Sequence, residues 1–113
     1  MKILAIPVSG GRLCPHFGHC ESFAIVEVDE KERKVVKTET VQAPPHEPGL
    51  LPEWLARRKV DVVVAGGMGS KAQELFSDEG IRVVTGADSI APEEIAMAYM
   101  DGSLRLRGNA CDH

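Results

Sequence analysis

The sequence predicts an α/β protein with a mixed, mostly parallel sheet of about five strands, the second antiparallel, and about three helices. Two observations carry this prediction. The first half of the chain contains three strand-like segments separated by turns, the pattern of an antiparallel meander. The second half alternates helical and strand-like segments. Strands that follow helical crossovers are expected to run parallel to the first strand.

The three strands of the meander are marked by apolar or β-branched residues and by the turns between them. The first strand ends at the turn Ser9-Gly10-Gly11, and the charged turn 29–33 joins the other two. The segment 43–49 contains three prolines and is predicted to be a loop. The predicted strands are residues 2–8, 22–28 and 34–42.

The second half changes to a helical period. A first helix is predicted to start near Pro52, which is tolerated in a first turn, and a second helix is closed by Gly80. A third helix is predicted to be capped by Ser89, to carry Pro92 in its first turn and to stop at Gly102. The other predicted bounds are 60–65 and 81–85 for the strands and 70–78 for the second helix.

Length and composition favour one domain. A chain of 113 residues can bury a single core, which we expect within 1–102, followed by a flexible tail at 103–113. The formal net charge of −4 argues against a general nucleic-acid binder. No apolar run reaches the roughly 20 residues of a membrane span, and no secretory leader is predicted. The odd number of cysteines, three, favours thiols or metal ligands over disulfides and predicts a cytoplasmic protein.

The segment 14–20 concentrates the chemistry of the chain. It reads Cys-Pro-His-Phe-Gly-His-Cys and holds two of the three cysteines and two of the four histidines. Thiolate and imidazole are the donors that soft metals prefer. The spacing is not that of a standard zinc site, and splayed donors suit a larger metal–sulfur cluster better. The alternative is a loop whose side chains hold no metal. The candidate ligands are Cys14, His16, His19 and Cys20.

Three further candidate ligands lie outside this segment. His46 belongs to the proline-rich loop, and the alternative for it is an exposed loop residue. Cys111 and His113 repeat the Cys-x-His spacing at the end of the sequence, where the alternative is a disordered tail. Metal binding by these residues would bring distant parts of the chain to one site.

A glycine turn forms a second part of the candidate site. Gly66-Gly67-Met68-Gly69 follows a predicted strand and opens the helix 70–78. As a dinucleotide motif it is weak, because it follows the fourth strand rather than the first. Uncovered backbone N–H groups at a helix start favour an anion, such as a metal–sulfur cluster. We expect Gly67 and Gly69 to leave this approach open and to need positive φ. The alternative is tight strand-to-helix packing, and both can hold.

The turn 66–69 and the loop 14–20 follow strands that are expected to be parallel. Ligands of open α/β sheets bind at the edge formed by the carboxyl ends of such strands. We therefore expect the loop and the turn to lie near each other.

Four segments together resemble a known family over roughly residues 1–107. They are Cys-Pro-His-Phe-Gly at 14–18, the strand pattern at 23–28, the segment from His46 to Leu55, and the pattern ending in Gly-Gly-Met-Gly at 60–69. This combination resembles the dinitrogenase iron–molybdenum cofactor biosynthesis family, which includes NifX-like carriers and the C-terminal part of NifB.

The resemblance implies a ribonuclease-H-like, three-layer fold without nuclease chemistry. It implies that the chain binds or carries an iron–molybdenum cofactor, its precursor or another metal–sulfur cluster. Carried over by position, the residues implicated are His16 and the turn 66–69, with Cys14 and His46 as neighbours. The implied partners are proteins that donate and accept the cluster, and a homo-oligomer is also an open expectation.

These observations lead to three hypotheses of function. The first is a non-enzymatic protein that binds or carries a metal–sulfur cluster containing iron and, as an open alternative, molybdenum. The second is a zinc-binding regulatory or interaction domain. The third, a thiol-based redox enzyme, is the least favoured. Neither a Gly-x-Ser-x-Gly elbow nor a Walker loop occurs in the sequence, so an enzyme is not predicted.

Overall fold

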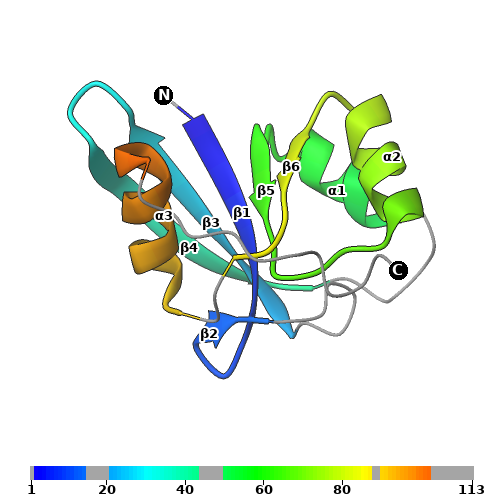
Figure 1. The fold of residues 1–113 in the computed structure, drawn as a ribbon, viewed down its shortest axis with the longest axis horizontal. Coiled ribbons are helices and arrows are strands. Elements are labelled where there is room, and N and C mark those ends of the chain that lie inside the picture. Colours follow the sequence, from blue (N-terminus) through cyan, green and yellow to red (C-terminus); the bar gives the residue numbers. More distant parts are fainter. Residues whose placement is uncertain (1, 15–20, 44–49, 88–89, 103–113) are drawn as a thin grey trace.

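The structure, a computed structural model, describes residues 2–14, 21–43, 50–87 and 90–102. These residues form an α/β fold of six strands and three helices (Figure 1). One strand more than the predicted five is present, because β2 is only two residues long and shows no period. The elements are β1 (Lys2–Ser9), β2 (Arg12–Leu13), β3 (Ser22–Asp29), β4 (Lys34–Gln42), α1 (Leu50–Arg57), β5 (Val62–Val64), α2 (Ser70–Asp78), β6 (Arg82–Val84) and α3 (Pro92–Asp101).

The sheet has the strand order β4-β3-β1-β5-β6, with β2 paired to the end of β1. β3 runs antiparallel to both β1 and β4, whereas β5 runs parallel to β1 and β6. The mixed sheet, the antiparallel second strand of the meander and the parallel later strands are therefore confirmed. β1, β4, β5 and β6 share one direction, so most strands are parallel in direction, although three of the five strand pairs are antiparallel.

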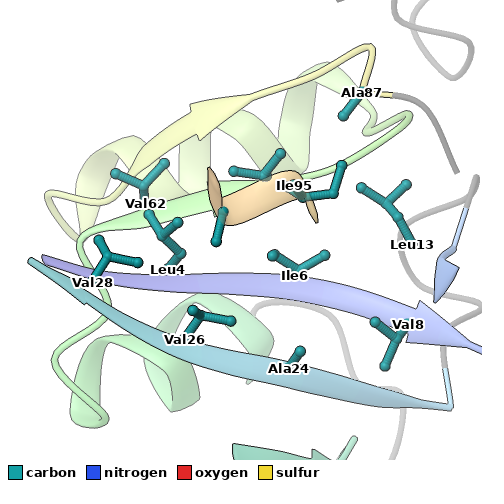
Figure 2. Packing of buried hydrophobic residues seen from close by; sticks show 12 residues of the cluster. Leu4, Ile6, Val8, Leu13, Ala24, Val26, Val28, Val62, Ala87 and Ile95 are labelled. Carbon is teal, nitrogen blue, oxygen red and sulfur yellow. The ribbon is translucent and has the colours of Figure 1, made fainter. Parts of the chain in front are cut away.

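The two faces of the sheet bury separate cores because side chains alternate along each strand. On one face Leu4 and Ile6 pack with Ile95 of α3, which contacts β1, β3 and β4 (Figure 2). On the other face Ala5 packs with residues of α1 and α2, including the fully buried Phe76. The sheet therefore lies between one helix on one face and two on the other.

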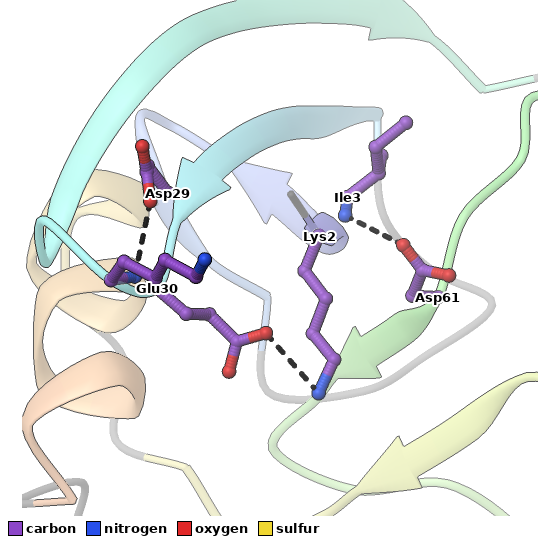
Figure 3. Close-up of polar contacts among 6 residues, drawn as sticks. Lys2, Ile3, Asp29, Glu30 and Asp61 are labelled. Atoms are coloured by element: carbon purple, nitrogen blue, oxygen red, sulfur yellow. Dashed lines mark hydrogen bonds and ion pairs between the residues drawn. The ribbon is translucent and has the colours of Figure 1, made fainter.

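The ends of the later strands differ from the prediction. β5 covers Val62–Val64 rather than 60–65, and β6 covers Arg82–Val84 rather than 81–85. At the start of β5 the Asp61 carboxylate accepts the Ile3 N–H at 2.9 Å (Figure 3). The strand centres were predicted by their apolar runs, while tertiary hydrogen bonds such as this one set the ends.

Both predicted ends of α2 and the predicted end of α3 are confirmed, whereas the predicted cap at the start of α3 is wrong. α2 has the predicted bounds, and α3 stops before Gly102, which adopts the left-handed conformation with φ +73°. α1 starts at Leu50, so Pro52 lies in its first turn, as expected. The N-cap of α3 is Ala91 instead of Ser89, because Pro92 is the first helical residue. In the described part of the chain, no helix has the length and apolarity needed to span a membrane.

Candidate metal-cluster site

β2 returns the chain to the edge of β1 that β5 leaves open. β3 occupies the opposite edge of β1 as far as the pair Val8–Ser22. On the β5 side, the Ile3 carbonyl accepts the Asp61 N–H at 2.8 Å. Carbonyls two residues apart point to the same edge. The Pro7 carbonyl, which accepts the Cys14 N–H at 2.8 Å, therefore faces the β5 side as well.

Cys14 consequently lies beyond the carboxyl end of β5. The last pair between β1 and β5 is Ala5–Val63, and Cys14 takes the edge of β1 two residues further on, at Pro7. Beyond this pair the chain of β5 continues beside β6, where the Ala65 N–H donates to the Val84 carbonyl at 2.8 Å. The register thus brings Cys14 next to the segment that enters the glycine turn, as expected for two parallel strands.

The backbone around Cys14 is fixed by the fold. The Leu13 N–H donates to the Ile90 carbonyl at 3.0 Å, and the Leu13 side chain lies in the core beneath α3 near Ala87 (Figure 2). Cys14 follows Leu13 and is buried as well. Only 5% of Cys14 is exposed, which distinguishes it from a cysteine on an open surface.

The glycine turn is held by contacts on both sides. The Gly66 carbonyl accepts the Gly86 N–H at 2.8 Å, and Gly86 has a left-handed φ of +88°. The Met68 carbonyl accepts a hydrogen bond from the Gln73 side-chain amide at 2.9 Å. Met68 is 1% exposed and belongs to the core under α1 and α2. The side chain of Met68 therefore anchors the turn.

The prediction that Gly67 and Gly69 need a positive φ is wrong for both residues. Gly69 is the N-cap of α2 and has φ −63° and ψ 152°, an extended conformation open to every residue type. The glycines with positive φ among the described residues are Gly10, Gly11, Gly80, Gly86 and Gly102. A Cβ atom built on Gly69 would meet no heavy atom within 4 Å. Glycine at this position keeps space open without relieving backbone strain.

The start of α2 has the electrostatic character of an anion site. No side chain of the described residues caps it, and its first turn contains no acidic residue. Lys71 adds a positive charge in that turn. The first N–H groups of a helix have no partner within the helix and carry the positive end of its dipole. An anion that approaches past Gly69 would meet these groups without a side chain in between.

Most of the predicted ligands lie outside the described residues. These are His16, His19 and Cys20 of the loop, together with His46, Cys111 and His113. Within the described ranges, no three His, Cys, Asp or Glu residues gather closely enough to hold a metal ion. The structure therefore defines Cys14 and residues 66–69 of the candidate site, and the other ligands stay predictions.

The sequence predicted the turn at Ser9-Gly10-Gly11 but not the short strand β2 that follows it, nor the contact that holds the glycine turn. Gly10 and Gly11, with φ +63° and +81°, form the turn that sends β2 back along β1. A Gly-Gly pair between Val8 and Leu13 is a known hairpin signal and could have revealed that this turn leads into a strand paired with β1. The Gly86 hydrogen bond to Gly66 has no such local signal, because it joins two turns far apart in sequence.

Comparisons with known proteins agree with this architecture. The family model described as dinitrogenase iron-molybdenum cofactor matches residues 1–102. An uncharacterised protein of Methanocaldococcus jannaschii, MJ0580, is 34% identical over 107 residues, covering 92% of this chain and 89% of that protein.

Solved structures share the fold. The crystal structure of PH0822 superimposes with a TM-score of 0.85 at 28% identity, over 94% of this chain and 95% of that one. The apo form of the orange protein from Desulfovibrio gigas gives 0.74 at 22% identity, over 96% of this chain and 95% of that one, which shows the fold alone. From the match over residues 1–102, we conclude that the chain belongs to the dinitrogenase iron–molybdenum cofactor family.

Proposed function

We propose that this protein binds a metal–sulfur cluster of the iron–molybdenum cofactor type and passes it on without catalysing a reaction. The family supports a role in the binding or biosynthesis of that cofactor. The observation that carries the proposal for this chain is a juxtaposition. Cys14, held beyond the end of β5, lies next to the turn that leads to the uncapped start of α2.

The two parts of this edge suit a cluster for different reasons. A Cys14 thiolate is a soft donor for iron, molybdenum or another soft metal. A metal–sulfur cluster is also a large anion, and the N–H groups behind Gly69 can donate hydrogen bonds to its sulfide or thiolate atoms. The cluster would be cargo, so the protein has to hold it with several weak contacts and keep one side accessible to a partner.

The remaining predicted ligands complete this proposal. His16 and Cys20 would approach the cluster from the loop, with His19, His46, Cys111 and His113 as further candidates. Partner proteins would donate and accept the cluster in the cytoplasm. The order of the strands is compatible with the ribonuclease-H-like description, which we keep as part of this proposal. Zinc remains the alternative, although nothing among the described residues favours it.

Anaerobic reconstitution tests the proposal. The apo protein is incubated with ferrous iron, molybdate and sulfide, desalted, and analysed for metal and sulfide per chain. We expect a coloured complex from the native chain and little retained metal from the double variant Cys14→Ser, His16→Ala. Ser77→Val, an exposed position at the far end of α2, is the matched control and should keep full occupancy. Full occupancy in the double variant would show that the cluster site lies elsewhere, and a colourless protein with one zinc would favour the alternative.

A further inference from the structure

β4 forms one outer edge of the sheet and is exposed along most of its length. Among the described residues no strand pairs with its outer side, and it lies beside α3 (Figure 1). Only Val35 and Val41 of this strand are even partly buried. Exposed edge strands offer unpaired N–H and C=O groups to another chain. The question is therefore which partner this edge fits.

The alternation of hydrogen bonds between β3 and β4 shows which backbone groups of β4 point away from the sheet. The Ala43 N–H donates to the Glu21 carbonyl at 3.1 Å, so this pair is of the hydrogen-bonded type. Moving two residues at a time along the ladder, Val41 and Glu39 also direct their backbone groups to β3. Thr38 and Thr40 consequently direct theirs away from the sheet, ready for a further strand.

The charges of β4 favour one register for pairing with a second copy, because only that register opposes charges of opposite sign. In an antiparallel pair, outward-facing residues must oppose outward-facing residues. A two-fold axis at Lys37 would oppose two lysines, and an axis at Glu39 would oppose two glutamates. An axis at Thr38 instead places Lys37 of each copy opposite Glu39 of the other. Opposite charges in directly opposed positions stabilise a sheet, whereas like charges destabilise it.

We infer that β4 is a homodimerisation edge, where two copies pair antiparallel about Thr38 and form one continuous sheet. The Thr38 N–H of each copy donates to the Thr38 carbonyl of the other, and Lys37 pairs with Glu39 on both sides of the axis. Lys37 and Glu39 share one face of the sheet, since both line the same shallow hollow with Ile25 and Arg58. The self-complementary charges identify the partner as a second copy of this chain.

The distribution of exposed apolar side chains supports this edge. Val36, 46% exposed, and Met97, 38% exposed, are the large apolar residues that stand out among the described ones. Val36 belongs to β4, and Met97 belongs to α3, the helix that contacts β4. The register shift between Glu27 and Val28 interrupts the regular ladder beside Val36, so the pairing is short. A short ladder predicts a weak, concentration-dependent dimer.

Charge reversal tests the register in the full-length protein. Sedimentation velocity from micromolar to millimolar concentration should show a dimer. Lys37→Glu or Glu39→Lys alone should weaken dimerisation about tenfold, because each places like charges opposite each other twice. The double variant Lys37→Glu, Glu39→Lys should restore it. Arg82→Glu on β6, the opposite edge strand, makes the same charge change and should leave the dimer intact.

Amide hydrogen exchange tests the same edge independently of the mutations. The Thr38 and Thr40 amides should exchange quickly in dilute protein and become protected as the concentration rises, whereas Glu39 and Val41 stay protected throughout. The inference is overturned if the chain remains monomeric at millimolar concentration, or if a dimer forms that ignores the charge reversals. Protection of Thr38 at every concentration would also overturn it, since a segment of the same chain would then cover the edge. Circular dichroism confirms that each variant folds.

Discussion

The starts of α2 and α3 differ in how the chain compensates the backbone N–H groups that have no partner within the helix. Neither N-cap, Gly69 or Ala91, provides a side-chain hydrogen bond. At α3, Pro92 removes one unpaired N–H group, and Glu93 and Glu94 place negative charge in the first turn. At α2 the first turn has no acidic residue. α3 therefore compensates its own positive end, whereas α2 leaves that end available to an external anion.

The opposite end of the sheet also contrasts with the open start of α2. At the amino ends of β1 and β5, Asp61 accepts the Ile3 N–H and the Lys2 ammonium lies 3.5 Å from the Glu30 carboxylate (Figure 3). The Asp29 carboxylate accepts the Lys31 N–H at 3.0 Å in the adjoining hairpin turn. Polar groups at that end are thus used within the chain. The open N–H groups of α2 stand out because neighbouring parts of the fold are closed in this way.

The largest expected effect separates the anchor of the turn from an exposed residue of the same type. Met68→Ala should lower the free energy of unfolding by about 2–5 kcal/mol, because Met68 is fully buried beneath the turn. Met97→Ala on α3 is the matched control and should cost less than about 0.5 kcal/mol, since Met97 is 38% exposed. Chemical denaturation of the apo proteins measures both. Equal costs would show that Met68 does not anchor the turn.

A second comparison separates strain from access. Gly86→Val should destabilise the protein by about 1–2 kcal/mol or more, because Gly86 has φ +88°. Gly69→Val should change stability by less than about 1 kcal/mol, because its backbone is extended and a Cβ there meets no atom within 4 Å. Gly69→Val should nevertheless reduce cluster retention after reconstitution. If it retains the cluster as well as the native chain, Gly69 does not guard the approach to α2.

The smallest effect is expected from metal removal. The two cores are built from apolar side chains of the sheet and helices and require no metal ligand. The chain in excess chelator should therefore keep its circular dichroism spectrum and unfold cooperatively on heating, unlike a zinc finger. Binding of the cluster should raise the unfolding temperature above this baseline. Loss of the cooperative transition in chelator would show that the metal is structural.

The parts of the fold with a strong sequence period were predicted, and those set by tertiary contacts were not. The strands of the meander and the helix Ser70–Asp78 follow from alternation and from a 3.6-residue period, and the structure confirms them. β2 was missed because two residues carry no period, and its place depends on pairing with β1. The error at Gly69 has a different origin, since glycine there was attributed to a positive φ as well as to open space, and only the space is present.

The candidate site was predictable to a different extent in its two parts. Parallel strands implied that the segments after β1 and β5 would meet, and the register of Cys14 at Pro7 agrees with that. The geometry of the metal ligands beyond Cys14 could not follow from spacing, because it depends on loop conformations. Their order of importance therefore remains a prediction: Cys14 and His16 first, then Cys20, then His46, and Cys111 last.

The most direct test gives α2 an anion of its own. Gly69→Asp places a carboxylate at an extended N-cap that has room for a side chain. The substitution should therefore raise the free energy of unfolding of the apo protein by up to about 0.5 kcal/mol. The same carboxylate should compete with the cluster for the first N–H groups and lower metal and sulfide retention. Ala91→Asp makes the equivalent change at α3 and should leave retention unchanged. The predicted result is that Gly69→Asp raises stability and lowers cluster retention, whereas Ala91→Asp does not lower retention. Full cluster retention in Gly69→Asp would contradict the account.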